Sequence, residues 1–318
     1  MLQNISDLFG FVPTPIDISL NLSKELSIKL LIKRDDLFYQ TGGGSKSRKI
    51  LYILQKAYNE GYNAIVTAGS SQSNHVRAAA LFAAKLGWKS TMIIHDKRPN
   101  GSFEGNLKIV SLTGSGIQFV DKDKVKDAMD YAMLDFKRQG YKPLYIWGGG
   151  HCLEGSYAYF DAFKELKEQL GNIDPDYIVM ASGTGTTQAG LEIGVRYFSP
   201  KCKVLGVSVS RTQKRGKEAI FDSMHTLNNF LQNSIALPND IFFDDRWIGN
   251  GYEATYPELL ETIHWAAKTD GLILDPTYTG KAFFALKKYI ESGFIPKDAT
   301  VVFWHTGGLL NLMSSKEI

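Results

Sequence analysis

Cysteine is scarce in this chain of 318 residues, and its scarcity excludes two kinds of small structural scaffold. The only cysteines are Cys152 and Cys202. They lie far apart and have no partners at the spacing of metal ligands. The chain therefore has neither a disulfide framework nor a cysteine-based zinc site, and we predict that it binds no metal.

Long apolar runs and an excess of one charge are also missing. No stretch of about 18 apolar residues occurs, so the sequence predicts no membrane span. The N-terminal MLQNISDLFGF lacks the basic region and apolar core of a signal peptide. A formal net charge of +3 gives no support for nucleic-acid binding, which usually requires a strongly basic face. We expect a cytoplasmic globular protein.

Short apolar segments alternate with longer amphipathic segments along the chain. The short segments are apolar on both faces, as strands of a buried parallel sheet are. This alternation predicts a doubly wound α/β fold, which binds ligands at the carboxyl ends of its strands. Residues 211–250 interrupt the pattern and are expected to decorate the main sheet. The predicted strands cover 30–33, 64–68, 90–95, 144–147, 177–182, 203–210 and 299–305, and the predicted helices cover 47–59, 74–86, 104–113, 124–138, 156–170, 187–198, 256–269 and 280–292.

Three loops at predicted strand–helix junctions contain glycine, namely TGGGSKSRKI (41–50), AGSSQSNH (68–75) and SGTGTTQAG (182–190). Glycine allows the backbone to approach a ligand closely, and a helix start adds partial positive charge. The third loop predicts a phosphate cradle, although a tight turn with a helix cap is an equally good reading. The P-loop and dinucleotide patterns do not match, so the sequence favours a small phosphate. The cradle residues are Gly183, Thr184, Gly185, Thr186 and Thr187.

Lys46 follows the first glycine loop directly, at the expected start of a helix. The helix macrodipole disfavours a cation there, so the pKa of this lysine should be lowered. A neutral amine is a nucleophile that forms a Schiff base with a carbonyl. A phosphate cradle together with such a lysine suggests pyridoxal 5′-phosphate (PLP), which carries an aldehyde and a phosphate. A solvated surface lysine is the alternative.

Several motifs in order resemble one enzyme family: PTPI (13–16), LLIKRDDL (30–37), GGGSKSRKI (42–50), SSQSNHVRAAALFAAKLG (70–87), SGTGTTQAGL (182–191), LDPTYTGKA (274–282) and HTGG (305–308). The chain resembles the fold-type II PLP enzymes of the D-cysteine desulfhydrase and 1-aminocyclopropane-1-carboxylate (ACC) deaminase group. The resemblance implies two α/β domains of the tryptophan synthase β type with PLP in the cleft between them. We expect a large domain of residues 1–49 and 161–318, a small inserted domain of residues 50–160, and a homodimer.

The resemblance also implies roles for individual residues. Lys46 would form the Schiff base, and Asn74 would donate to the phenolic oxygen of PLP. The substrate carboxylate would be held by Ser73, Asn74 and His75. Further cofactor-binding residues would be Lys49, Thr279 and the cradle residues 183–187, and Thr306 would bind the substrate. The implied catalytic residues are Lys46, Ser73, Tyr252 and Tyr278.

Structural roles for the same residues stay open. Ser73 and Asn74 could cap the helix that starts at residue 74. Tyr278 could be a half-buried core residue, and His75 a satisfied polar one. Arg34, Asp35 and Asp36 are expected to form a structural ion-pair cluster.

Two threonines favour one branch of the family. Thr279 is expected to face the pyridine nitrogen, where ACC deaminases resemble Y-E-G-K; a threonine gives a weaker electron sink than a glutamate. Thr306 stands where ACC deaminases resemble H-L-G-G. Both positions match D-cysteine desulfhydrases. The implied reaction is α,β-elimination, in which Lys46 removes the Cα proton, sulfide leaves, and the aminoacrylate product hydrolyses to pyruvate and ammonia.

Two departures from the family pattern keep other functions open. Ser45 replaces the asparagine that precedes the lysine, and WGGGHCLEGSYAY (147–159) places Trp147, His151, Cys152 and Tyr159 near a possible substrate mouth. The alternatives are PLP-dependent β-replacement, ACC deaminase-like ring opening, and a PLP-binding protein without catalytic activity.

Overall fold

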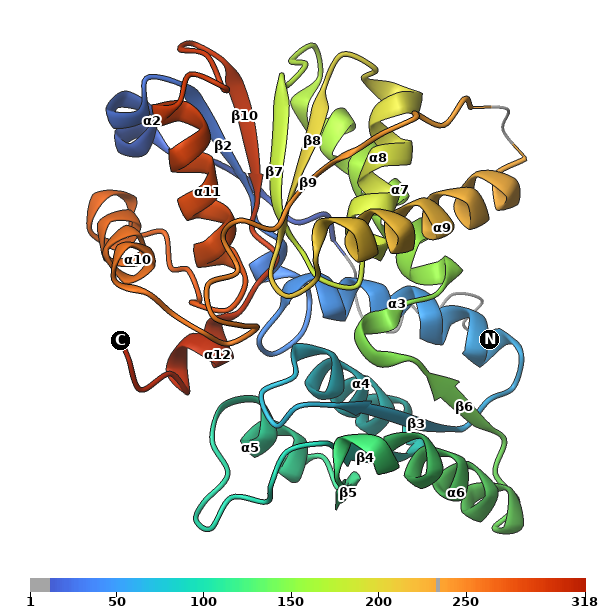
Figure 1. Ribbon diagram of the computed structural model, residues 1–318. Helices are drawn as coiled ribbons and strands as arrows, with labels where there is room; N and C mark the ends of the chain where they lie inside the picture. Colours follow the sequence, from blue (N-terminus) through green and yellow to red (C-terminus); the bar gives the residue numbers. More distant parts are fainter. Residues whose placement is uncertain (1–11, 233–234) are drawn as a thin grey trace.

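Two separate β-sheets organise the chain in a computed structural model that describes residues 12–232 and 235–318 (Figure 1). The larger sheet has the strand order β1–β2–β10–β7–β8–β9, and only β1 runs antiparallel to its neighbour. The smaller sheet has the order β5–β4–β3–β6 and is parallel throughout. The larger sheet consists of β1 (Ile16–Ile18), β2 (Lys29–Lys33), β7 (Tyr177–Ser182), β8 (Lys203–Ser208), β9 (Phe242–Asp244) and β10 (Thr300–Trp304), and the smaller of β3 (Ala64–Gly69), β4 (Lys89–Ile94), β5 (Gly116–Phe119) and β6 (Pro143–Ile146).

Helices cover both faces of the larger sheet. Alternate residues of its central strand enter different cores, as the period of a strand requires. Val179 packs with α2 (Leu20–Leu26), α10 (Pro257–Asp270) and α11 (Thr279–Glu291). Its neighbours Ile178 and Met180 pack on the other face, where α7 (Leu153–Leu170) and α8 (Thr186–Phe198) lie. This two-sided burial explains why β7 is a continuous apolar run.

The smaller sheet is also covered on both faces. The helices α3 (Gly44–Asn59), α4 (Asn74–Leu86) and α5 (Gly105–Leu112) share one apolar core with it. Helix α6 (Val125–Arg138) covers the opposite face. Both sheets are therefore doubly wound, as the alternation of segments predicts.

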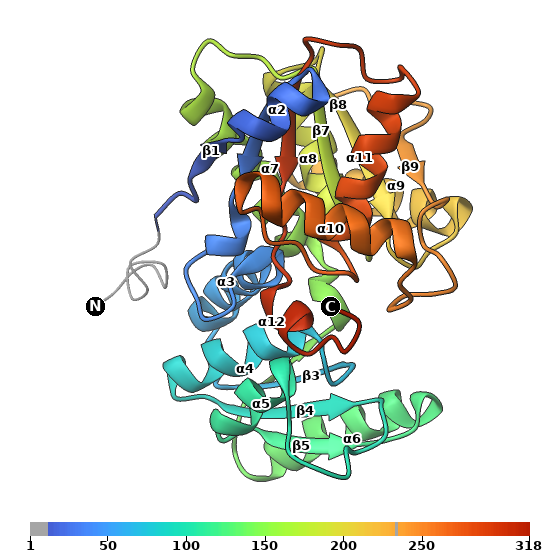
Figure 2. The same ribbon diagram turned by 90° about the vertical axis from the view of Figure 1, so that its left-hand side faces the viewer.

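The two parts meet at the ends of their strands. Helix α3 and the short helix α12 (Leu309–Met313) lie between the sheets (Figure 2). The loops that follow β2, β3, β7 and β10 all reach this junction, because each contributes residues to the lining of one cavity. Parallel strands thus deliver the three predicted glycine loops, after β2, β3 and β7, to one place.

The strong strand predictions and all eight predicted helices are confirmed within a few residues, whereas the weak edges of the sheets are not predicted. Strands β1, β5 and β9 have three or four residues each, and the first two are partly exposed. Such strands lack the apolar runs of central strands. The 211–250 segment supplies α9 (Gln213–Phe230), which packs against α8, and the edge strand β9.

The predicted domain boundary between residues 160 and 161 falls inside α7. Tyr159, Phe163 and Leu166 of this helix all belong to the core of the larger sheet. The division of the chain into domains stays a prediction.

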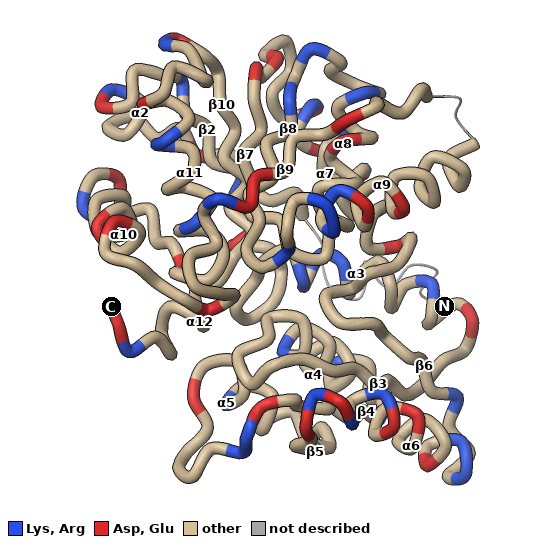
Figure 3. Tube along the Cα trace, in the orientation of Figure 1, with Lys and Arg blue, Asp and Glu red and all other residues tan. Residues whose placement is uncertain are grey.

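Charged residues of both signs are interspersed along the chain around both sheets (Figure 3). Within the described ranges, no helix is both long and apolar enough to cross a membrane.

A buried ion-pair network anchors α3 to the larger sheet. Asp35, with no exposed surface, pairs with Arg48 of α3 at 2.8 Å, and Arg48 also pairs with Glu165 of α7 at 2.8 Å. Burial alone would raise the pKa of Asp35, but Arg48 holds it below its usual value. The hydroxyl of Tyr159 and the indole of Trp304 donate to the same carboxylate at 2.6 and 2.9 Å.

The predicted cluster of Arg34, Asp35 and Asp36 is only partly correct. Arg34 pairs with Asp36 and with Asp17 near the surface. Asp35 points the other way, into the core, where its partner is Arg48. In this short turn the side chains of Arg34 and Asp36 point to one side and that of Asp35 points to the other, so residues adjacent in sequence belong to two different ion-pair groups.

We predict that Arg48→Met lowers the free energy of unfolding by about 3–5 kcal/mol, because it leaves the Asp35 carboxylate buried without its charged partner. Thermal unfolding of the cofactor-free protein measures this loss. Arg34→Met is the matched control, and its partly exposed pairs should contribute only about 0–1 kcal/mol. Equal losses for the two variants would contradict the assignment of Arg48 as the anchor.

Candidate active site

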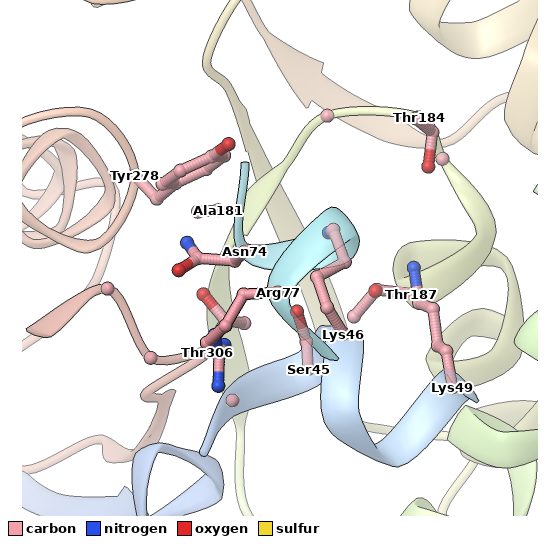
Figure 4. A pocket seen from close by; sticks show the side chains of 15 residues that line it. Ser45, Lys46, Lys49, Asn74, Arg77, Ala181, Thr184, Thr187, Tyr278 and Thr306 are labelled. Carbon is pink, nitrogen blue, oxygen red and sulfur yellow. The ribbon is translucent and has the colours of Figure 1, made fainter. Parts of the chain in front are cut away.

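Two adjoining cavities lie at the junction of the sheets. We call them the inner pocket, which reaches Asn74, Arg77 and Thr306, and the outer cavity, of about 410 Å³, which reaches Ser73 and His75. Both are lined by Lys46, Gly183, Thr184 and Tyr278. Figure 4 shows Lys46 between Asn74 and Thr306 on one side and Lys49 and Thr187 on the other.

The glycine loop before Lys46 is shaped by close backbone contacts. Gly43 has φ +44°, and a Cβ there would lie 1.9 Å from the carbonyl oxygen of Asp36. The backbone N–H of Ser45 donates to the carbonyl of Thr306 at 2.9 Å. Only glycine allows the loop to pack this tightly against the turn before it, which fixes Lys46 in the first turn of α3.

Lys46 is a half-buried side chain whose amine has a lowered pKa, as predicted. Burial lowers its pKa to about 8. The cause is loss of hydration, which disfavours the charged form, whereas the sequence argument invoked the helix macrodipole. The direction of the prediction is confirmed and its reason is corrected.

The predicted phosphate cradle forms the start of α8. Gly185 precedes this helix with φ +100°, where glycine is favoured. In the described part of the chain, the hydroxyl oxygen of Thr184 is buried without a hydrogen-bond partner. Gly183, Thr184, Gly185 and Thr187 line the inner pocket. Free N–H groups at a helix start suit an anion.

Thr186 and Lys49 stand beside this cradle. Thr186 is absent from the residues that line the two cavities, but its hydroxyl accepts from the Lys49 amine at 2.7 Å. Burial, and then repulsion from Lys46, lowers the pKa of Lys49 well below its usual value. A phosphate in the cradle would supply the negative charge that this buried amine lacks.

The start of α4 carries the second group of predicted residues. Ser73 caps the helix, and its hydroxyl oxygen accepts from the N–H of Val76 at 3.3 Å. The capping role is therefore confirmed, and Ser73 also lines the outer cavity. Asn74 lines the inner pocket and donates to Asn311 at 2.6 Å.

His75 is buried and contacts the hydroxyl of Thr67 at 2.8 Å. Burial, with added repulsion from Lys46 and Lys49, lowers its pKa to about 3. The imidazole is therefore neutral at physiological pH.

The two predicted tyrosines face each other across the outer cavity. The hydroxyls of Tyr252 and Tyr278 are hydrogen-bonded, and their rings pack edge to face with centroids 5.7 Å apart. Burial raises the pKa of Tyr278 above its usual value, so its hydroxyl stays protonated. Lys281 holds the segment of Tyr252 in place by donating to the carbonyls of Ile248, Gly251 and Tyr252.

The two threonines predicted to distinguish the branches lie differently. Thr306 lines the inner pocket. Thr279 is fully buried, donates to the Asp275 carboxylate at 2.7 Å and accepts from the Asp275 N–H at 2.9 Å. Thr279 is not among the residues that line either cavity, and its role at the pyridine nitrogen stays a prediction.

The segment 147–159 does not form the substrate mouth in the way the sequence suggests. Only Gly148 and Gly149 line the outer cavity. His151 and Cys152 line a different depression together with Ser156 and Asp222. Tyr159 is fully buried against Asp35, so its expected place at the mouth is wrong; its hydroxyl is needed by the ion-pair network.

Sequence reasoning missed several residues around the cavities. Arg77 lines the inner pocket, and a cluster of charged side chains lines the outer cavity: His95, Asp96, Lys122, Arg211 and Glu253. Arg77 lies on α4 within the motif 70–87. His95, Asp96 and Arg211 lie at the ends of predicted strands, which could have indicated them, whereas Lys122 and Glu253 carry no such signal.

Comparison with known proteins agrees with this geometry. The family model of the pyridoxal-phosphate dependent enzyme matches residues 8–307. This chain belongs to that family. The family confirms the predicted cofactor, PLP, and the prediction that the protein is an enzyme.

Within this family, the chain is similar to curated D-cysteine desulfhydrases. A D-cysteine desulfhydrase of Klebsiella pneumoniae (strain 342) is 30% identical over 318 residues, covering 96% of each chain. A D-cysteine desulfhydrase of Salmonella choleraesuis (strain SC-B67) is 31% identical over 308 residues, covering 95% of this chain and 93% of the relative.

Solved structures confirm the predicted fold type. The crystal structure of an ACC deaminase homologue is 28% identical, with a TM-score of 0.84 over 98% of this chain and 97% of the other. Threonine deaminase isoform 2 from Solanum lycopersicum is 17% identical, with a TM-score of 0.65 over 93% of this chain and 79% of the other. The latter likeness concerns the fold alone.

The residues present fit PLP. Among the residues that the structure describes, the buried Thr184 hydroxyl of the cradle has no hydrogen-bond partner, and the buried amine of Lys49 lies next to it at Thr186. The cradle also presents the N–H groups of a helix start. Lys46 lines the same pocket with a lowered pKa. An anion site and a nucleophilic amine in one pocket are the two features that a phosphorylated aldehyde requires.

We predict that the rate of PLP attachment to the cofactor-free protein rises with pH and reaches half its maximum near pH 8, because only neutral Lys46 attacks the aldehyde. Stopped-flow absorbance across a pH series measures this rate. Borohydride reduction and peptide mapping identify the labelled lysine, and Lys46→Ala should not be labelled. A midpoint near the usual lysine pKa, or label on Lys49, would contradict the assignment.

Proposed function

We propose that the protein is a carbon–sulfur lyase that converts D-cysteine and water to pyruvate, hydrogen sulfide and ammonia. The observation that carries this proposal is the hydrogen-bonded pair of Tyr252 and Tyr278, which lines the same cavity as Lys46, next to the cofactor pocket. The likeness to D-cysteine desulfhydrases over nearly the whole chain supports it. PLP supplies an electron sink for the bond-breaking at Cα.

Each end of the substrate has suitable groups in this arrangement. The start of α4 offers backbone N–H groups of Asn74 and His75 to the carboxylate. Ser73 adds a hydroxyl at the same end of the outer cavity. A neutral His75 suits this role because it leaves the site without a further titrating charge.

Lys46 is the proposed base at Cα. The pocket lowers the pKa of the free Lys46 amine to about 8, which suits proton transfer near neutral pH. The Cα–H electron pair then forms the Cα–Cβ double bond, and the Cβ–S pair leaves with sulfur. Tyr278 keeps its proton, and the O–H of the tyrosine pair that is not used between the two hydroxyls is placed to donate a hydrogen bond to the departing sulfur.

A second candidate is ring opening of ACC, which the likeness to an ACC deaminase homologue favours. The residue after Tyr278 argues against it in this chain, because a threonine there supplies no carboxylate for the ring nitrogen. β-Replacement would use the same groups with a second nucleophile at Cβ.

Assembly and location are further parts of the proposal. We expect a homodimer, which light scattering of the purified protein measures, and a cytoplasmic location.

We expect D-cysteine to yield pyruvate and sulfide in equal amounts, because elimination releases one of each per turnover. Coupled assays of both products in one sample measure this ratio, with L-cysteine and ACC tested in parallel. Lys46→Ala should lower turnover by about 10³-fold or more. Lys126→Ala is the matched control, since its amine lies on exposed α6, and it should leave turnover unchanged.

Each alternative outcome identifies another reaction. α-Ketobutyrate from ACC would replace the proposal with ring opening. Release of sulfide from D-cysteine without formation of pyruvate would indicate β-replacement.

A further inference from the structure

A network of side-chain amides lies behind Asn74, on the side of the inner pocket next to Thr306. Asn106 of α5 donates to the Oδ1 of Asn74 at 3.0 Å, and Asn74 donates to the Oδ1 of Asn311 of α12 at 2.6 Å. Asn106 has no exposed surface and Asn311 is 7% exposed. The network therefore joins the helices of the smaller sheet to the C-terminal segment through buried hydrogen bonds.

Each end of the network is fixed by a group that has only one hydrogen-bonding role. The guanidinium of Arg77 can only donate, and its Nε–H donates to the Oδ1 of Asn106 at 3.0 Å. The carbonyl of Gln72 can only accept, and it receives the amide groups of both Asn106 and Asn311 at 3.0 Å. The orientation of both outer amides follows from these two anchors.

The orientation of Asn74 follows in turn. Its oxygen must face the Asn106 amide group, and its NH₂ group must face the Asn311 oxygen. An NH₂ group has two N–H donors, so one remains after the bond to Asn311. Asn74 is thus held as a donor toward the pocket, and its oxygen is occupied elsewhere.

We propose that Arg77, Asn106 and Asn311 are positioning residues that hold the Asn74 amide as a hydrogen-bond donor toward the phenolic oxygen of PLP. This inference rests on the proposed role of Asn74 at the cofactor. The network removes the alternative orientation, in which the amide oxygen would repel the phenolate. A supporting shell of this kind holds a binding group in its productive orientation.

Arg77 connects the amide network to the loop before Lys46 through hydrogen bonds to neutral groups. Its guanidinium lies in the pocket wall and donates to the carbonyl of Gly43 at 3.0 Å, to the carbonyl of Thr41 and to Asn106. The same side chain therefore holds both the loop before Lys46 and the amide network.

The test compares two substitutions of identical chemistry. Asn106→Asp keeps an acceptor for Arg77 but replaces the donor to Asn74 with a carboxylate oxygen. The Asn74 amide then turns to donate to that carboxylate, because a charge-assisted hydrogen bond is about twice as strong as a neutral one, and its donor leaves the cofactor. Asn311→Asp adds the same charge in the same network but still accepts from Asn74, so the donor stays.

The readouts are the pH titration of the visible absorbance of the bound cofactor and the PLP affinity of the cofactor-free protein. A donor to an oxygen favours its deprotonated form, so losing it raises the pH at which the spectrum changes. We expect Asn74→Ala, the reference, and Asn106→Asp to raise this midpoint by about one pH unit and to weaken PLP binding about tenfold. Asn311→Asp should have clearly smaller effects on both.

The outcomes separate the inference from the proposed function on which it rests. If Asn74→Ala itself leaves the spectrum and affinity unchanged, Asn74 does not contact the cofactor and its proposed role fails. If Asn74→Ala has its effect but Asn106→Asp has none, or if both Asp variants act equally, the positioning role is wrong. Thermal unfolding of each cofactor-free variant confirms that it folds.

Discussion

The buried pair of Asp35 and Arg48 is the interaction on which the active-site geometry depends. Two charges without exposed surface must satisfy each other, since either alone would be costly in the interior. Arg48 lies two residues after Lys46 on α3, and Asp35 follows strand β2 of the larger sheet. Tyr159 and Trp304 complete the carboxylate shell from α7 and β10. The pair thus fixes the lysine-bearing helix against the sheet whose loops supply the phosphate cradle.

Much of the fold and the centre of the site could be predicted from sequence because their signals are local. A buried parallel strand is a short apolar run, and β7 shows this in Ile178, Val179 and Met180. The glycine loops could be located because a left-handed backbone or a close contact requires glycine, as Gly43 and Gly185 demonstrate. Since parallel strands bring their carboxyl ends together, three such loops could be expected to meet.

The remaining features depend on partners far apart in the chain, for which no local pattern exists. Asn74 and Asn311 are separated by 237 positions, and Arg48 and Glu165 by 117. Tyr159 lies in a segment that the sequence places near a substrate mouth, yet its hydroxyl donates to the Asp35 carboxylate, 124 positions away. A buried charge needs hydrogen-bonding or charged partners, and only the assembled fold shows which residues supply them.

The active site brings three basic side chains together. Lys49 and Arg77 are buried and Lys46 is half-buried, and loss of hydration lowers the pKa of each. Among the residues described, none of the three forms an ion pair with a carboxylate. Lys49 donates to a hydroxyl, and Arg77 donates to an amide oxygen and to backbone carbonyls. The cofactor phosphate and the substrate carboxylate are the anions that this pocket lacks. Because a ligand that binds only the folded state stabilises it, anions that bind these basic groups also couple cofactor binding to the stability of the fold.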